Sequence, residues 1–136
     1  MSFEFPIRVY WEDTDAGGIV FYANYLKFFE RARTEWLRSL GISQARLRDE
    51  SGGMFVVSET AVRYLRPARL DDVIRISARV ASAGAASVNI EQEARAEPDG
   101  RLLASGTIRL GWVDADTLMP ARMPAVVIQA LEGPAP

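Results

Sequence analysis

The segment of the chain best suited to chemistry is acidic and rich in glycine: residues 12–18 read EDTDAGG. It places three carboxylates, one threonine and two glycines within seven positions. The chain has no histidine and no cysteine, which excludes histidine-based triads, thiolate nucleophiles and zinc–sulfur sites. Acid–base chemistry would therefore depend on carboxylates, tyrosine, lysine or backbone groups.

The composition indicates what kind of protein holds this segment. A chain of 136 residues suits a single domain that is large enough to bury a core. Apolar residues make up 49% and charged residues 25%, as in ordinary soluble proteins. The net charge of −2 argues against a nucleic-acid-binding protein. No apolar run is long enough to span a membrane and no secretory signal is visible, so we expect a cytoplasmic protein without a membrane span.

The elements that would position the acidic segment lie on both sides of it. Residues 5–11 alternate apolar and polar side chains and predict a first strand, and the period changes to that of a helix over residues 22–40. Gly41 is a suitable C-cap for this helix, and Ser43 is expected to cap a short second helix that continues through Glu50. The apolar helix face consists of Tyr25, Phe29, Ala32, Trp36 and Leu40.

The rest of the chain follows the two-residue period of strands. This order predicts an α+β fold, in which an antiparallel sheet wraps one long central helix. The strands are predicted over residues 55–64, 73–81, 87–97 and 102–113, and a short helix over 125–131.

We expect a single domain over residues 1–136, with a core over about 5–131 and a frayed tail over 132–136. The three tryptophans, Trp11, Trp36 and Trp112, are expected in this core. One sheet around one helix leaves strand edges and an open face uncovered. Self-association is therefore expected to cover them.

Three segments carry a resemblance to a known family: RVYWEDTDAGGIVFYANYLKFFERARTEWLRSLGI, YLRPARLDD and GWVDADTLMPARMP. They closely resemble the hot-dog-fold acyl-CoA thioesterases, most of all the bacterial Tol–Pal-associated branch, which is related to 4-hydroxybenzoyl-CoA thioesterase. The likeness covers about residues 7–125. It implies a hot-dog fold, and a homodimer that associates further into a homotetramer.

The resemblance also implies catalytic positions. The family's catalytic aspartate corresponds to Asp15, the last acidic residue of the EDTD segment, and its oxyanion contact corresponds to the backbone N–H of Tyr22. Thioester hydrolysis needs a carboxylate that attacks the carbonyl or activates water, and donors that stabilise the oxyanion. The start of a helix offers such unpaired N–H groups. At the position of Tyr22 the Tol–Pal-associated branch usually carries histidine, whereas the hydroxybenzoyl branch carries tyrosine. Because this chain has tyrosine there, its substrate range is expected to differ from that of the Tol–Pal-associated branch.

Other polar residues near the motif have alternative interpretations. Glu30 on the long helix is the second candidate for the catalytic carboxylate, although ion pairing with a neighbouring arginine is favoured. Glu12 and Asp13 are expected to be solvated or structural. Asn24 is expected to orient the loop or cap the helix. Gly17 and Gly18 are expected to let the backbone approach the substrate closely.

Coenzyme A carries phosphates, for which the planar fork of arginine is well suited. The predicted substrate-binding arginines are Arg63, Arg66 and Arg69 around the RPAR turn; Arg75, Arg79 and Arg122 are further candidates. No metal and no cofactor are expected, since coenzyme A is part of the substrate.

The predicted function is hydrolysis of acyl-CoA thioesters to free acid and coenzyme A. Two alternatives stay open: a non-enzymatic acyl-CoA-binding or regulatory module, and a thioesterase that acts on acyl carrier protein thioesters. A hot-dog dehydratase or hydratase is disfavoured, because such enzymes resemble a class that uses a histidine together with a carboxylate, and this chain has no histidine.

Overall fold

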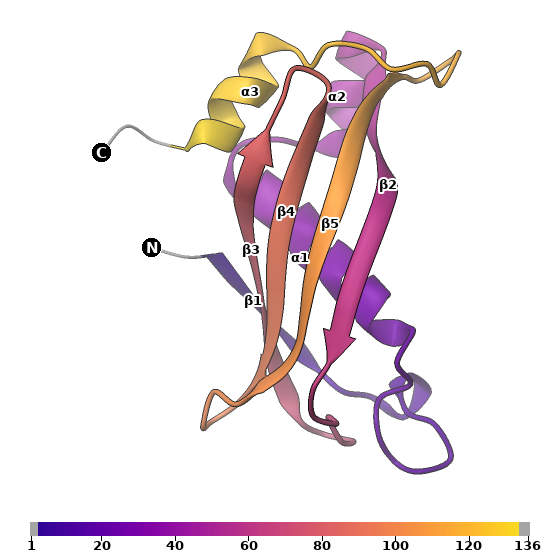
Figure 1. Ribbon diagram of the computed structural model, residues 1–136, viewed down its shortest axis with the longest axis vertical. Coiled ribbons are helices and arrows are strands. Elements are labelled where there is room, and N and C mark those ends of the chain that lie inside the picture. Colours follow the sequence, from indigo (N-terminus) through magenta and orange to yellow (C-terminus); the bar gives the residue numbers. More distant parts are fainter. Residues whose placement is uncertain (1–2, 134–136) are drawn as a thin grey trace.

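The computed structural model describes residues 3–133 and consists of one curved sheet against a long helix (Figure 1). The sheet holds five antiparallel strands in the order β1-β3-β4-β5-β2. The α+β prediction is confirmed. The strands are β1 (Phe3–Arg8), β2 (Gly53–Tyr64), β3 (Val73–Ala83), β4 (Ser87–Ala96) and β5 (Leu102–Asp114).

The long helix α1 (Asn24–Ser39) crosses one face of this sheet (Figure 1). The helix ends because Gly41 adopts a φ of 87°, which glycine reaches at little cost. The Gly41 and Ile42 N–H groups then bond to the carbonyls of Arg38 and Leu37. The predicted apolar face is buried: Tyr25, Phe29, Ala32 and Trp36 lie in the core, and Leu40 packs against it.

The alternation predicted for the central strands is also observed. Every second residue of β4, from Val88 to Ala96, is buried against the helix side of the sheet. Gly53 begins β2 two residues earlier than predicted, and a Cβ there would lie 2.5 Å from the Trp112 ring. A larger residue would therefore displace this core indole.

Two further helices complete the fold. Helix α2 (Gln44–Ser51) ends at Gly52, which has a φ of 75°. The expected cap by the Ser43 side chain is wrong, because this side chain makes no capping hydrogen bond. Helix α3 (Ala125–Glu132) covers one end of the sheet with Val127 and Leu131 (Figure 1). Of the tail predicted to fray, residues 134–136 lie outside the described chain. None of the helices within residues 3–133 is long and apolar enough to cross a membrane.

The first strand is shorter than predicted, and Trp11 is not in the core. β1 ends at Arg8, and a 3₁₀ turn, η1 (Trp11–Asp13), follows. The buried Asp13 carboxylate accepts a hydrogen bond from the Tyr10 N–H at 2.8 Å, which turns the chain and ends the alternation. Trp11 therefore points outward with 80% of its surface exposed, whereas Trp36 and Trp112 are buried as predicted.

Candidate active site

The acidic segment forms a tight hairpin just before α1. Thr14 and Val20 pair as an antiparallel bridge. The Asp15 N–H donates to the Ile19 carbonyl at 2.9 Å, and the Gly18 N–H donates to the Asp15 carbonyl at 3.0 Å. Gly18 has a φ of 77°, a backbone conformation that residues other than glycine rarely adopt. Asp15 is thus held at the tip of an ordered turn.

The Asp15 side chain is exposed and bonded on one oxygen only. Its Oδ1 accepts the Gly17 N–H at 2.8 Å. A Cβ at Gly17 would lie 3.2 Å from the same oxygen, so glycine allows this close approach. Among the hydrogen bonds within residues 3–133, Oδ2 accepts none. One carboxylate oxygen is therefore oriented and the other is available for chemistry.

A second set of contacts fixes the hairpin to the helix. The Asp13 carbonyl accepts the Phe21 N–H and the Asn24 Nδ2 group, both at 2.9 Å. Asp13 is buried and structural, and Asn24 orients the loop, as predicted. The distance between the Asp15 turn and the start of α1 is consequently set by short, well-formed bonds.

Within residues 3–133, the N–H groups of Tyr22 and Ala23 are left without a hydrogen bond. The Phe21 N–H bonds to Asp13 and the Asn24 N–H bonds to the Phe21 carbonyl. The two intervening N–H groups, those of Tyr22 and Ala23, donate no hydrogen bond to any residue in the range 3–133. They lie at the positive end of the α1 dipole, where a developing negative charge would be stabilised.

An aromatic cavity of about 230 Å³ lies beside these donors. Tyr22 packs edge-on against Tyr64 with ring centroids 5.8 Å apart, and Tyr25 lies 5.6 Å from the same ring. Burial raises the pKa of Tyr25 to about 12, an effect that the nearby Ala68 backbone partly offsets. Burial also raises the pKa of Tyr64, helped by Tyr22. The cavity is lined by Ile19, Val20, Tyr22, Tyr25, Tyr64, Leu65, Arg66 and Pro67.

Sequence reasoning missed Tyr25 and Tyr64 as residues of this site. Tyr25 was assigned to the apolar helix face, and Tyr64 to the end of a strand. Their convergence depends on how β2 lies along α1, which no local pattern reveals. The adjacent aromatic residues Phe21 and Tyr22, just before the helix, are a local signal that could have indicated an aromatic site.

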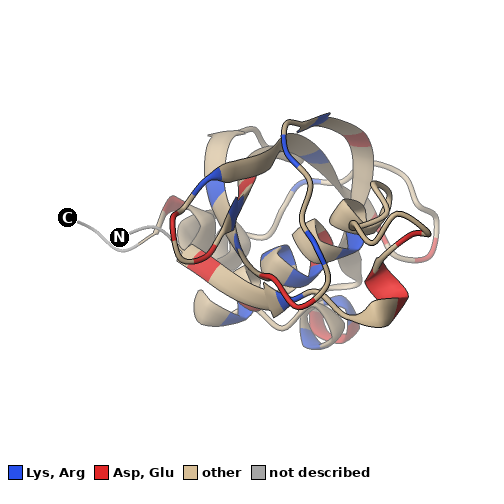
Figure 2. Ribbon diagram, turned by 90° about the horizontal axis from the view of Figure 1, so that it is seen from below, with Lys and Arg blue, Asp and Glu red and all other residues tan. Residues whose placement is uncertain are grey.

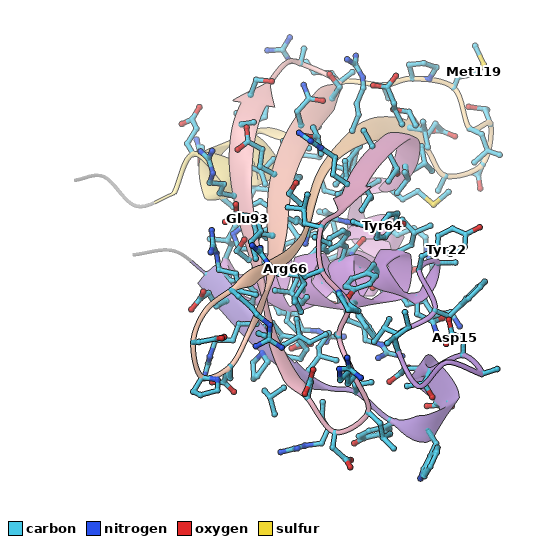
Figure 3. All side chains as sticks on the ribbon, turned by 60° about the horizontal axis from the view of Figure 1, so that its bottom comes forward. Asp15, Tyr22, Tyr64, Arg66, Glu93 and Met119 are labelled. Atoms are coloured by element: carbon cyan, nitrogen blue, oxygen red, sulfur yellow. The ribbon has the colours of Figure 1, made fainter. Side chains whose placement is uncertain are left out.

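The structure brings Asp15 and Tyr22 to the same side of the molecule, with Tyr64 next to Tyr22 (Figure 3). Asp15 does not line the aromatic cavity; it lies on the hairpin next to it. Within the described residues, no group of histidine, cysteine, aspartate or glutamate side chains is arranged to hold a metal ion.

The predicted arginines are not gathered together. Arg66 lines the aromatic cavity and donates to the Leu102 carbonyl at 3.2 Å. Arg69 pairs with Ile19 as a β-bridge, so it lies beside the Asp15 hairpin. Arg63 lines a different depression, of about 530 Å³, together with Arg79 and Glu93. Viewed from this end of the molecule, basic and acidic segments are interspersed (Figure 2).

The remaining charged candidates have local roles. Arg75 pairs with Glu97 at 2.7 Å, and Arg79 pairs with Glu91. Arg122 is exposed. Glu30 accepts a hydrogen bond from the Thr34 hydroxyl at 2.9 Å. The favoured ion pair of Glu30 with a neighbouring arginine is wrong for residues 3–133, where no arginine nitrogen lies within pairing distance of it.

A sheet wrapped around one long helix is the hot-dog architecture, and comparisons with known proteins assign this chain to the thioesterases among the proteins that share it. A family model described as the thioesterase-like superfamily matches residues 9–131. An acyl-CoA thioesterase YbgC from Haemophilus influenzae is 42% identical over 126 residues, which cover 93% of this chain and 91% of the relative. An acyl-CoA thioesterase YbgC from Helicobacter pylori is 33% identical and covers 91% and 96%.

Solved structures agree on the fold. A 1,4-dihydroxy-2-naphthoyl-CoA thioesterase from Synechocystis superimposes with a TM-score of 0.90 at 20% identity, covering 98% of this chain and 97% of the other. A protein from Aquifex aeolicus reaches 0.88 at 27% identity, covering 95% and 98%. The chain belongs to the thioesterase-like superfamily, and the expected hot-dog fold is confirmed.

Proposed function

We propose that the protein hydrolyses acyl-CoA thioesters to free acid and coenzyme A. The observation that carries the proposal is the pair of free N–H groups at Tyr22 and Ala23, next to the Asp15 hairpin and an aromatic cavity. The names of the relatives, acyl-CoA thioesterases at up to 42% identity, support the same reaction class. The donors match the charge that develops on a thioester oxygen in the transition state.

In the proposed mechanism the thioester carbonyl oxygen points at the Tyr22 N–H. The Asp15 carboxylate either attacks the carbonyl carbon or removes a proton from an attacking water. The oxyanion then collapses: the carbonyl double bond re-forms, the carbon–sulfur bond breaks, and the sulfur leaves with the electron pair as coenzyme A thiolate. If water attacks, this collapse gives the free acid, and the proton held by Asp15 passes to the thiolate, which restores the carboxylate. If the carboxylate attacks, water hydrolyses the resulting anhydride and restores Asp15. The acyl group occupies the aromatic cavity.

The phosphates of coenzyme A would be bound by arginines near the cavity. Arg66 is the first candidate because it lines the cavity, and Arg69 is the second because it flanks the hairpin. Arg63 faces a separate depression, so among the three predicted arginines it is the least suited to the same substrate molecule. Gly17 and Gly18 would serve the substrate by keeping the hairpin tip narrow. We propose no further cofactor and a cytoplasmic site of action.

An assay of thiol release tests the proposed function. The protein is incubated with aliphatic and aromatic acyl-CoA thioesters of increasing chain length, and a thiol reagent detects the released coenzyme A. The same acyl groups carried by acyl carrier protein are assayed in parallel. We expect turnover of the coenzyme A thioesters. Binding of acyl-CoA without any turnover would favour the alternative of a non-enzymatic module. Turnover restricted to acyl carrier protein thioesters would favour the second alternative.

A further inference from the structure

A second cavity, of about 160 Å³, lies farther along α1 from the Asp15 hairpin. It is enclosed by α1, the start of α2 and the strands β2 and β5, and it shares no residue with the aromatic cavity. Figure 1 shows β5 beside β2, with α2 near the upper end of these strands and α1 behind the sheet. Its lining consists of Glu30, Arg33, Thr34, Leu37, Gln44, Phe55, Val57 and Leu110.

The unusual residue in this lining is Arg33, a cation that is only 8% exposed. Its Nη1 donates to Gln92 Oε1 at 2.9 Å. Gln92 is itself buried, and its amide nitrogen donates to the carbonyls of Phe29 and Ser77 at 3.0 and 3.2 Å. The Gln92 side chain is therefore held in one orientation by the helix and by β3. It offers Arg33 an acceptor but no compensating charge.

The other donors of Arg33 are unused. A guanidinium has five N–H groups, and among residues 3–133 Gln92 is its one side-chain acceptor, with no carboxylate in ion-pair distance. The Tyr25 hydroxyl is the single fully enclosed side-chain polar atom without a partner in the described chain. The unbonded Arg33 nitrogens are therefore not sealed in the core, and they open on the cavity that Arg33 lines.

A buried charge of this kind calls for a counter-ion. Burial lowers the pKa of Arg33, which the nearby Glu30 partly opposes, yet arginine stays protonated in proteins. Glu30 acts on this charge from beyond ion-pair distance, and a buried charge without a directly contacting counter-ion is costly. An anion that enters the cavity would restore the balance, since the guanidinium fork pairs in bidentate fashion with planar acids.

The walls of the cavity narrow the choice of anion. Leu37, Phe55 and Leu110 are apolar and would contact an alkyl group. Glu30 also lines the cavity and disfavours a doubly charged anion such as phosphate. The volume corresponds to about five water molecules at roughly 30 Å³ each, which is room for a carboxyl group and a few carbons.

We propose that this cavity binds a short-chain carboxylate, whose carboxyl group pairs with Arg33 and whose alkyl group packs on Leu37, Phe55 and Leu110. This is the chemical class that hydrolysis of a short acyl thioester releases. The site lies apart from Asp15 and Tyr22, so its existence does not depend on the catalytic roles proposed for them.

Calorimetric titration of the full chain, in its native assembly, with acetate, butyrate and hexanoate tests the proposal. We expect saturable binding that sodium chloride at equal ionic strength does not reproduce. Arg33→Met should weaken binding at least about tenfold, the range for a lost charged hydrogen bond. Arg31→Met, an exposed arginine on the same helix, should leave it unchanged. If Arg33→Met does not fold, Phe55→Trp, which fills the cavity and keeps Arg33, should abolish binding instead.

Three results would overturn the proposal. The first is the absence of saturable binding, or binding that Arg33→Met and Phe55→Trp leave intact. The second is inorganic phosphate binding as tightly as butyrate, which would make the cavity a general anion site. The third is dissociation of the Arg33→Met assembly into smaller species, measured by sedimentation, together with no detectable binding of carboxylates to the wild type. In that case the counter-charge is a carboxylate of a second copy of the chain.

Discussion

Asp15 illustrates how a side chain can be oriented without being buried. One of its oxygens accepts the Gly17 N–H, while the other is free to act. The turn that contains it depends on glycine at positions 17 and 18. These glycines were predicted to serve the approach of a substrate. Their visible role is to let the backbone fold back onto the Asp15 carboxylate.

We predict that Asp15→Asn lowers kcat at least about 100-fold, because the amide keeps the acceptor for Gly17 but loses the base or nucleophile. Stopped assays of thiol release give kcat, and circular dichroism checks the fold. Glu12→Gln, an exposed neighbour on the same loop, is the matched control and should stay active. If Asp15→Asn turned over near the wild-type rate, the assignment would be wrong, and Glu30→Gln would be the next variant to measure.

At Tyr22 we expect the backbone, not the phenol, to take part in the reaction. Its N–H lies at the helix start and donates to no residue of the described chain, whereas its ring packs on Phe21 and Tyr64. Tyr22→Phe should therefore cost less than about tenfold in kcat/KM, since a helix-end donor does not depend on the side chain. Tyr22→His should change the acyl preference, because the side chain borders the cavity.

The measurement for Tyr22 is kcat/KM over a series of acyl chain lengths. A loss of about 1000-fold in Tyr22→Phe, similar to a lost oxyanion donor, would show that the phenol itself donates. A change in stability with unaltered substrate preference in both variants would instead make Tyr22 a simple wall residue.

At the scale of elements, the site is built where α1 begins and β2 ends. Tyr25 joins the two, since it lies on the buried face of α1 and contacts the Tyr64 ring at the end of β2. Its hydroxyl is enclosed, and although the Ala68 backbone lies close enough to influence its pKa, no hydrogen bond of good geometry reaches it among residues 3–133. An enclosed hydroxyl without a partner destabilises the folded state.

The Tyr25 pKa predicts how stability changes in alkaline solution. The pKa of Tyr25 in the folded protein, about 12, lies above the ordinary tyrosine value of 10.0. Between these two pH values the unfolded chain loses the phenolic proton while the folded chain keeps it, so stability falls as pH rises. This lowers the free energy of unfolding by about 2–3 kcal/mol near pH 12. Below about pH 9 the effect on stability is absent.

Tyr25→Phe should remove this part of the alkaline loss and be neutral or stabilising by about 1 kcal/mol at pH 8. Urea unfolding at pH 8 and at pH 11 measures both effects. Tyr10→Phe, on a ring that is 60% exposed, is the control for removing a tyrosine hydroxyl outside the core. A large loss of stability at pH 8 in Tyr25→Phe would mean that the hydroxyl has a partner in the assembled protein.

The elements themselves were largely predictable. The buried face of α1 and the alternation in β4 follow from periods of 3.6 and two residues, which depend only on which side faces the core. Trp11 was misplaced because a buried carboxylate, Asp13, interrupts the alternation with a turn. The contact of Tyr25 with Tyr64, and that of Arg33 with Gln92, join segments far apart in the chain. Such contacts depend on packing, which local patterns do not encode.

At the scale of the whole molecule, the exposed apolar side chains are distributed unevenly. Several lie around the start of α1 and along β2, which is an edge strand of the sheet. An open edge beside exposed apolar side chains favours association with a second copy. The exposed residues of this surface are Phe21, Tyr22, Leu26, Val57, Tyr64 and Leu65.

We therefore predict a symmetric homodimer that covers this surface and associates further into a homotetramer, with active sites at the subunit junctions. Light scattering or sedimentation at micromolar concentration should give a mass of two or four chains. Leu26→Lys places a charge in the surface and should shift the population to smaller species, and activity should fall with it because the cavity at Tyr22 and Tyr64 becomes more open to water. Val126→Lys, an exposed position on α3, is the matched control and should keep both mass and activity. A folded and fully active monomer, in the wild type or in Leu26→Lys, would contradict the prediction.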